Sequence, residues 1–384
     1  MEDMERLSME RTQLFRDVYD GKIPKRVPIA TAVDIAYAIQ YAGYDLKEAQ
    51  WNLYLLKDVI DKAARDFKSD GVPTVFLRIP LMYQILGAKN FVMSSEGFMQ
   101  HPEVSAMEAE EYDELIKDPY KFIIEKVLPR LYKNLDTTPE KRSIVFAKAY
   151  KVFYDSMMQV GIYSAEAARK YGLSMEGLGT LIEAPFDFIA DQMRGFTNIV
   201  KDIRRIPEKV AEACEAILPL MLKAGLAPEP SSYKRAFIPL HMPPYLRTSD
   251  FEKVFWPTFK KLVDGLVEKG MGVDLFLEQD WMRYIDYLAE LPKGVKMWFE
   301  YGDPKLIKER LGKKHIITGL YPISLLRTGN KKECIDKAKE LVDILAPGGG
   351  YIFNFDKSPL VLNDAKPENI IAVNEFVREN AVYK

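Results

Sequence analysis

The sequence holds one histidine and two glutamates whose positions are suited to metal chemistry: His241, Glu278 and Glu300. Each directly follows a short apolar run. One imidazole and two carboxylates can bind Zn²⁺ and leave a fourth coordination position open, as catalytic zinc sites do. A glutamate after a strand also often caps the next helix or pairs with a lysine, and the wide spacing of this trio leaves that alternative open. The first prediction is a zinc site made by these three residues.

The other two histidines are weaker candidates. His315 follows two lysines and opens its apolar run, so it is expected at the opposite end of a strand from the trio. His101 lies in a loop-like segment without helper residues, which favours a structural or solvated side chain. The glycine run 348–350 leads into a strand, so we expect a tight turn there and not a phosphate cradle. No Gly-x-Ser-x-Gly, Walker or kinase signature is present.

The elements that must position the trio follow a regular pattern after residue 233. Short apolar runs alternate with amphipathic helical stretches, and each run is followed by a polar turn. This βα repetition predicts a parallel sheet covered by helices. The expected strands are 235–240, 272–277, 295–299, 315–320 and 351–355, and the expected helices are 249–269, 281–291, 304–311 and 331–345.

The first 230 residues show a less regular pattern. A charged helix is expected at the N-terminus, ended by Gly21, and a second helix shows apolar residues at helical spacing. Two apolar runs beside prolines are typical of short buried strands. The expected helices are 1–20, 45–68, 108–135 with breaks near Pro119 and Pro129, 164–171 and 207–224, and the expected strands are 26–30 and 74–79.

Two observations favour a barrel over an open, doubly wound sheet. No Gly-x-Gly-x-x-Gly fingerprint follows an early strand, and the βα units continue evenly towards residue 384. We therefore predict a (β/α)₈ TIM barrel with an N-terminal helical extension, as a single domain over residues 1–384. Because barrel enzymes carry their chemistry where the strands end, the trio is expected to converge at the barrel mouth.

Composition excludes several classes of protein. The 54 basic and 56 acidic residues nearly cancel, so no excess positive charge is present to bind nucleic acid. The two cysteines, Cys214 and Cys334, lie in helix-like polar stretches and form no disulfide framework, which favours the cytoplasm. Residues 1–17 lack the apolar core of a signal peptide, and no apolar run approaches the roughly 20 residues that span a bilayer. No membrane association is expected.

Several segments resemble the uroporphyrinogen decarboxylase superfamily. Residues 347–354 (PGGGYIFN), followed by AKPEN at 365–369, are similar to its closing motif. Trp256-Pro257 lies in a helix that resembles the one after its fourth strand, and residues 184–202 resemble its central segment. TGLYP at 318–322 stands where the family usually has Gly-Asn-x-x-Pro. The resemblance covers most of the chain and implies a (β/α)₈ barrel.

The departures from the family are informative. The decarboxylases carry an arginine-rich N-terminal segment that holds the carboxylates of the porphyrinogen, whereas no arginine pair follows residues 26–34 here. The family's Gly-His-Gly near the last strand is replaced by Phe355-Asp356-Lys357. A substrate with many carboxylates needs several guanidinium partners. Decarboxylation of uroporphyrinogen is therefore not expected.

The same superfamily contains corrinoid-dependent methyltransferases. Those that act on coenzyme M bind zinc through a His-x-Cys pair and a later cysteine; His241 matches the histidine, but Pro243 stands at the cysteine and no cysteine lies near Asp356. A site of one histidine and two carboxylates leaves zinc a stronger Lewis acid, suited to polarising an ether oxygen. The resemblance thus implies the methyltransferase component of an anaerobic O-demethylase, which moves a methyl group from a methoxylated aromatic substrate to cob(I)alamin.

In this hypothesis the trio holds the zinc ion, Asp356 is a fourth ligand or manages a proton, and Tyr301 and Tyr321 donate hydrogen bonds at the mouth. The chain lacks the Asp-x-His-x-x-Gly pattern of corrinoid carriers, so the corrinoid is expected on a separate protein. The expected partners are that protein and a small-molecule methyl donor, with a homodimer as a possible assembly. The alternatives are uroporphyrinogen-type decarboxylation, methyl transfer to coenzyme M, and a barrel that binds a ligand without catalysis.

Overall fold

The computed structural model describes residues 2–76 and 78–383. Met1, Leu77 and Lys384, which fall within segments predicted above, lie outside the described residues. The main sheet is parallel and has six strands in the order β10-β9-β8-β7-β6-β5. These strands are β5 (Gly177–Leu181), β6 (Lys234–Leu240), β7 (Gly272–Asp280), β8 (Lys296–Tyr301), β9 (Ile316–Gly319) and β10 (Tyr351–Ile352).

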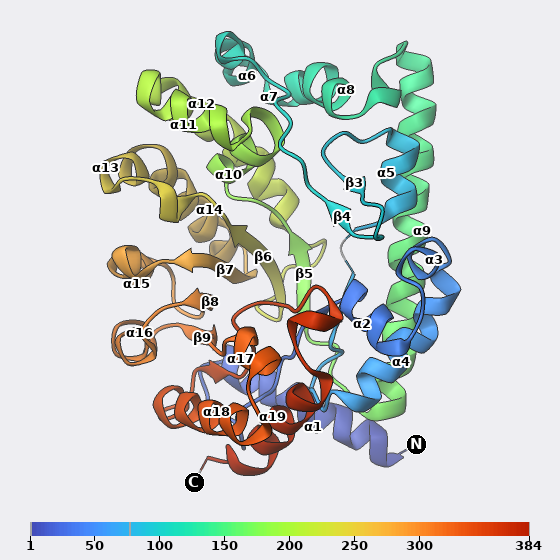
Figure 1. Cartoon of the computed structure of the whole chain (residues 1–384). Helices are drawn as coiled ribbons and strands as arrows, with labels where there is room; N and C mark the ends of the chain where they lie inside the picture. The colour runs from blue at the N-terminus through green and yellow to red at the C-terminus, as the bar shows by residue number, and fades with distance from the viewer. Residues whose placement is uncertain (1, 77, 384) are drawn as a thin grey trace.

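Two short parallel segments complete the ring of strands. β1 (Val33–Asp34) pairs with β2 (Thr74–Val75). A parallel bridge joins Ile29 to Phe353, just after β10, and another joins Gly71 to Ser174, just before β5. Eight segments thus follow one another around a barrel in chain order, and the helices lie outside them (Figure 1). The predicted (β/α)₈ fold is confirmed.

The second half of the chain follows the predicted βα pattern closely. All five predicted strands are present, and β7 runs to Asp280. β5 was not predicted, because a run with two glycines, GLGTL, lacks the β-branched composition of a strand. The helices are α10 (Pro185–Ile189), α11 (Phe196–Arg205), α12 (Pro207–Gly225), α13 (Thr248–Asp250), α14 (Trp256–Glu268), α15 (Ile285–Glu290), α16 (Pro304–Leu311), α17 (Ile323–Thr328), α18 (Lys331–Leu345) and α19 (Pro367–Asn380).

The first half departs further from the sequence prediction. The expected strand 26–30 forms only isolated bridges, and the expected strand 74–79 is cut short because Pro80 begins a helix. The expected helix 164–171 is only the end of α9 (Pro139–Tyr171). The other elements are α1 (Glu2–Tyr19), α2 (Ile35–Ala42), α3 (Leu46–Trp51), α4 (Leu56–Asp66), α5 (Pro80–Leu86), β3 (Val92–Met93), β4 (Met99–Gln100), α6 (Tyr112–Lys117), α7 (Pro119–Phe122) and α8 (Leu128–Leu131).

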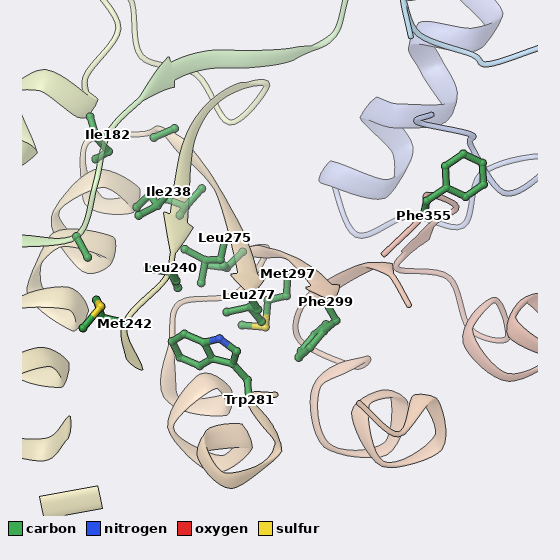
Figure 2. Close-up of a cluster of buried hydrophobic side chains, with 14 of the residues drawn as sticks. Ile182, Ile238, Leu240, Met242, Leu275, Leu277, Trp281, Met297, Phe299 and Phe355 are labelled. Atoms are coloured by element: carbon green, nitrogen blue, oxygen red, sulfur yellow. The ribbon is translucent and has the colours of Figure 1, made fainter. Parts of the chain in front are cut away.

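The apolar core lies between the strands and the outer helices. Successive side chains of a strand point to opposite faces, so every second residue of β6, β7 and β8 faces the helices. Figure 2 shows such residues packed together, with Trp281 from the loop after β7 among them. Those drawn from the three strands are almost completely buried: Ile238, Leu240, Leu275, Leu277, Met297 and Phe299.

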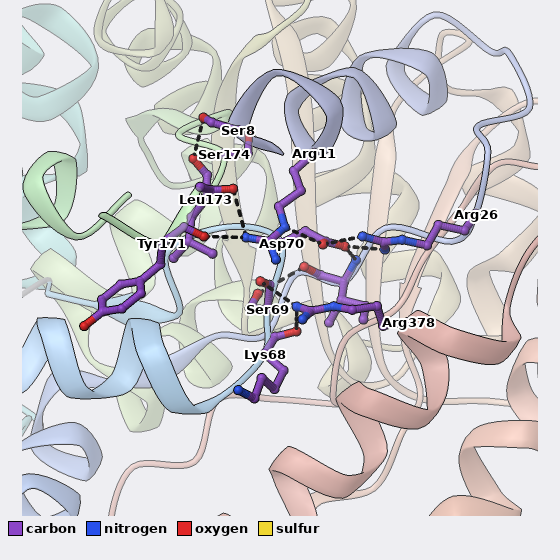
Figure 3. Close-up of polar contacts among 12 residues, drawn as sticks. Ser8, Arg11, Arg26, Lys68, Ser69, Asp70, Tyr171, Leu173, Ser174 and Arg378 are labelled. Carbon is purple, nitrogen blue, oxygen red and sulfur yellow. Dashed lines mark hydrogen bonds and ion pairs between the residues drawn. The ribbon is translucent and has the colours of Figure 1, made fainter. Parts of the chain in front are cut away.

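A buried carboxylate fastens the N-terminal helix to the barrel. Asp70, just before β2, accepts two hydrogen bonds from the guanidinium of Arg26 at 2.7 and 2.6 Å and one from the backbone N–H of Ile29 at 2.8 Å. Arg11 of α1 lies 3.4 Å from the same carboxylate and donates to the carbonyls of Tyr171 and Gly172 (Figure 3). The predicted N-terminal extension is therefore joined to the strands by ionic contacts.

No helix in residues 2–76 and 78–383 combines the length and the apolar character required to cross a bilayer.

Candidate active site

Three layers of side chains fill the inner face of β6, β7 and β8. Alternation along each strand assigns every second residue to this face. In the register Asp274 is opposite Lys296, and Phe276 is opposite Trp298, whereas Arg235 and Phe237 of β6 lie one inward position nearer the amino end than the β7 side chains they contact. His241 and Glu278 extend the pattern of their strands to the carboxyl end, where barrel enzymes bind substrate. From the amino end to the carboxyl end, the layers are Arg235, Asp274 and Lys296; Phe237, Phe276 and Trp298; and His241, Glu278 and Glu300.

The lowest layer is a closed ion cluster. The carboxylate of Asp274 contacts both Arg235 and Lys296, and it is almost completely buried. Burial acts to raise the pKa of Asp274, but the two cations outweigh it and hold that pKa below its ordinary value. The middle layer is aromatic: the rings of Phe276 and Trp298 lie 4.5 Å apart, and Phe237 lies 6.4 Å from each. All three rings are only half-buried, so they form an aromatic floor below the mouth.

His241 is the centre of the top layer. Its Nδ1 lies 2.8 Å from Oε2 of Glu278, and its Nε2 lies 3.7 Å from Oδ2 of Asp191. Burial acts to lower the pKa of His241. The hydrogen bond and charge of Glu278, with the charges of Asp191 and Asp187, act in the opposite direction and outweigh burial, so this pKa rises to about 9. The imidazole is therefore protonated at neutral pH, donates from Nδ1 to Glu278, and carries a second proton on Nε2.

A β-bulge separates Glu300 from the other two members of the predicted trio. The register between β7 and β8 shifts after Leu277, and Gln279 has a left-handed backbone with φ of 61°. The backbone N–H of Gln279 donates to Oε2 of Glu300 at 2.7 Å, while Lys357 binds its Oε1. Bulges of this kind often re-aim side chains beside active sites. Here the bulge directs Glu300 to a lysine.

The predicted zinc ligands therefore do not form a metal-binding group. His241 and Glu278 are brought together, but Glu300 is neutralised by Lys357. Across residues 2–76 and 78–383, no group of three or more histidine, cysteine, aspartate or glutamate side chains is placed to hold a metal ion. The residues present thus do not fit zinc through this trio. The prediction missed the ion pair because sequence spacing does not show which cation a carboxylate meets.

A group of carboxylates surrounds the other side of His241. Glu183 lies in the loop between β5 and α10, and Asp187 and Asp191 lie four residues apart on one face of α10 and the π-helical turn after it (Ala190–Arg194). Asp187 is fully buried; one of its oxygens accepts from the backbone N–H of Met242 at 3.2 Å, and the other has no partner among the residues that the structure describes. One oxygen of Glu183 accepts from Gln192, and the other likewise has no partner within residues 2–76 and 78–383.

These carboxyl groups hold protons at unusually high pH. Burial raises the pKa of Glu183 to about 7, and the charge of Asp191 adds to that effect. Burial also raises the pKa of Asp187 well above its ordinary value, again helped by Asp191. Carboxylates this close cannot all be ionised at once in a buried site. The three carboxyl groups thus share protons beside the imidazolium of His241.

The remaining predicted site residues lie on the β8–β10 side of the mouth. Asp356 accepts from the backbone N–H groups of Ile323 and Lys357 at 3.1 and 2.8 Å, and burial raises its pKa to about 6. Tyr301 is exposed, and the ammonium of Lys357 lies 5.7 Å from its ring centre. The ring of Tyr321 is fully buried, and its hydroxyl donates to the carbonyl of Cys334 in α18 at 2.9 Å.

The other two histidines do not join the site as ligands. His101 stacks on Phe91 at 4.5 Å; burial, and the charges of Arg78 and His241, lower its pKa. His315 is buried directly before β9, at the end of the strand away from the mouth, and burial lowers its pKa to about 4. Sequence reasoning did miss Glu183, Asp187 and Asp191. Their spacing was the available signal, but the strand that precedes them was not recognised.

Comparison with known proteins agrees with this fold. The profile of the uroporphyrinogen decarboxylase (URO-D) family matches residues 174–380, more than half of the chain. No curated protein matches the sequence. Among solved structures, a methyltransferase from Methanosarcina mazei superposes with a TM-score of 0.62 at 14% identity, over 96% of this chain and 98% of that one. That likeness concerns the fold. The chain belongs to the uroporphyrinogen decarboxylase family.

Proposed function

We propose that this protein is a methyltransferase that takes the methyl group of a methoxylated aromatic compound and passes it to the cob(I)alamin of a separate corrinoid protein. The observation that carries the proposal is the pairing of His241 Nδ1 with Glu278 at 2.8 Å above a half-buried aromatic floor, and the raised pKa of His241 supports it. The fold that this chain shares with a methyltransferase from Methanosarcina mazei is consistent with it.

The His241–Glu278 pair supplies what ether cleavage requires. As cobalt attacks the methyl carbon, the carbon–oxygen bond breaks and negative charge develops on the aryl oxygen. Nε2 of His241 can donate its proton to that oxygen, so the products are methylcobalamin and a neutral phenol. Glu278 accepts from Nδ1 at 2.8 Å and stabilises the imidazolium until the transfer. General acid catalysis of this kind contributes typically about 10²–10⁴-fold to a rate.

The aromatic floor suits a flat substrate. Phe276 and Trp298 lie one inward position before Glu278 and Glu300, and Phe237 lies two before His241, so a ring resting on Phe276 and Trp298 would bring its oxygen substituent towards the imidazole. Aromatic pairs prefer offset or edge contacts with centroids roughly 4.5–7 Å apart. The tilted Phe276 and Trp298 offer such surfaces.

The charge of the mouth argues against the alternative substrates. Glu183, Asp187, Asp191 and Glu278 lie around a single imidazolium that is already paired with Glu278, so an added carboxylate would have to compete for that cation. Uroporphyrinogen and the anionic coenzyme M are both disfavoured on this ground. A neutral methyl ether brings no charge into the cluster.

The zinc ion expected from the sequence does not enter this proposal, because its expected ligand set is not assembled among the described residues. The corrinoid carrier remains part of the proposal, and its cobalt would have to approach from the solvent side of the mouth. The proton transfer from His241 does not require a zinc ion.

The test combines the full-length protein with chemically reduced cob(I)alamin and a set of methoxyaromatics under anaerobic conditions. The expected result is the spectrum of methylcobalamin together with one equivalent of the demethylated phenol. Uroporphyrinogen and coenzyme M with methylcobalamin are run in parallel. Turnover of either, or no turnover of any methoxyaromatic, contradicts the proposal.

Metal analysis of the same preparation separates the two roles open to His241. We expect activity to survive treatment with a chelator. A stoichiometric zinc ion that is lost in His241→Asn would instead make His241 a ligand and exclude it as the proton donor.

A further inference from the structure

Three arginines share a single carboxylate at the amino ends of the barrel strands. Arg11 belongs to α1, Arg26 to the segment after α1, and Arg378 to α19. Their common neighbour, Asp70, lies just before β2, and Figure 3 shows the three side chains brought into one region beside it. The group thus joins both ends of the chain to the barrel, on the side opposite the mouth.

The charges of this group do not cancel. Asp70 is completely buried, and its carboxylate accepts from both terminal nitrogens of Arg26 at 2.7 and 2.6 Å, while Arg11 lies 3.4 Å away. Arg378 donates instead to two backbone carbonyls in the segment directly before Asp70. One carboxylate cancels the charge of one guanidinium group, so two positive charges remain.

The two arginines that lack a full partner show the effect of this surplus. Burial, followed by the charge of Arg378, lowers the pKa of Arg11 to about 10, and Asp70 only partly offsets this. Burial also lowers the pKa of Arg378, although Asp70 and two glutamates of its own helix, Glu375 and Glu379, act in the opposite direction. The negative charges of the chain therefore do not fully compensate the two buried cations.

Two buried N–H donors of this group also lack an acceptor. The Nε–H of Arg11 and the Nε–H of Arg378 form no hydrogen bond with any residue that the structure describes. Buried polar groups are nearly always hydrogen-bonded, and an unpaired charged donor is a costly exception. A water molecule would accept a hydrogen bond but bring no charge. An anion supplies both the acceptor and the missing negative charge.

We propose that a small inorganic anion of the size of chloride binds among the guanidinium groups of Arg11, Arg26 and Arg378. Arg11 is 7% exposed and the side chain of Arg26 is 15% exposed, which favours a small ion over an organic acid. The ion reaches the group past Arg378, which is only half-buried. It stabilises the attachment of α1 and α19 to the barrel, and it is independent of the reaction proposed above.

Thermal unfolding of the full-length protein tests the proposal. Sodium chloride replaces sodium gluconate at constant ionic strength, so that only the identity of the anion changes. An ion that binds the folded chain raises Tm by an amount that grows with its concentration. For a chain of 384 residues we expect a rise of about 1–2 °C for each tenfold increase in chloride above its Kd. A Tm that is the same in gluconate and in chloride overturns the proposal.

Two variants locate the ion. Arg378→Met removes one of the surplus charges and should abolish the dependence of Tm on chloride. Arg6→Met, at an exposed arginine of the same helix as Arg11, should keep that dependence. Circular dichroism confirms that each variant is folded, and Arg11→Met takes the place of Arg378→Met if the latter does not fold. An undiminished chloride dependence in the folded site variant would place the ion elsewhere and overturn the proposal.

A crystal of the unaltered chain grown with sodium bromide gives an independent measurement. Bromide replaces chloride in such sites and scatters anomalously. We expect an anomalous peak in contact with at least two of the three guanidinium groups. The absence of a bromide peak among these arginines would contradict the site, whatever the variants show.

Discussion

The two sides of the barrel mouth differ in how their charges are satisfied. On the side of β5, β6 and β7, His241 faces several carboxylates, and buried oxygens of Glu183 and Asp187 have no partner. On the side of β8, β9 and β10, Glu300 is paired with Lys357, and Asp356 accepts from two backbone N–H groups. Unsatisfied buried polar groups cost stability, so the retention of these carboxylate oxygens beside His241 favours a role for them in the proposed chemistry. We expect the β8–β10 side to contribute mainly to stability.

Removing the imidazole of His241 should have the largest effect on the demethylation rate. His241→Asn keeps a polar side chain but cannot donate a proton at the same pKa, so we expect the demethylation rate to fall by about 10²–10⁴-fold. The measurement is the initial rate of methylcobalamin formation. His101→Asn is the matched control, since His101 stacks on Phe91 and should change the rate only slightly. Equal rates for the wild type and His241→Asn would sink the assignment.

The pH dependence should sharpen the comparison. With a pKa of about 9, His241 stays protonated across neutral pH, so the rate should be level and fall above that value. Glu278→Gln removes the charge that raises this pKa, and the falling limb should move toward about 6.5. At about pH 8 the variant should then be roughly 30-fold slower, with little change at about pH 6. An unmoved limb would show that Glu278 does not act on His241.

The same shift has a consequence for stability. Because the pKa of His241 is higher in the folded chain than in the unfolded one, its protonation contributes stability in full below about 6.5. That contribution is lost as the pH rises through about 9.

The paired side should respond in stability more than in rate. Lys357→Met leaves the buried carboxylate of Glu300 with only the backbone N–H of Gln279, at a cost of about 2 kcal/mol. Adding Glu300→Gln should recover part of that loss, because the double variant leaves no unpaired charge. Urea denaturation measures both. A large loss of rate in folded Lys357→Met would move catalysis to this side.

The smallest effect is expected at Tyr301. Tyr301→Phe keeps the ring beside Lys357 and removes only an exposed hydroxyl, so stability should change by less than roughly 0.5 kcal/mol. The rate should change by less than about twofold on the same reasoning. A tenfold fall in rate would restore the original prediction that Tyr301 donates a hydrogen bond to substrate.

The contrast between the halves of the chain explains what sequence could predict. The second half alternates strong apolar runs with amphipathic helices, so the ends of β6, β7 and β8, and with them His241, Glu278 and Glu300, were placed correctly. The first half forms its part of the ring from strands of two residues and isolated bridges. Such short segments show no detectable alternation of apolar and polar residues. Closure of the barrel, and not the local sequence, therefore decides which strands they pair with.

The sequence by itself determined the barrel and the strand ends that carry polar groups, because period-two alternation and turn residues act locally. Only the tertiary structure decided that Lys357 neutralises Glu300, that Tyr321 faces α18, and that Glu183, Asp187 and Asp191 gather beside His241. These contacts join residues far apart in the chain. Their energies depend on burial and on distances between charges, which no local pattern records.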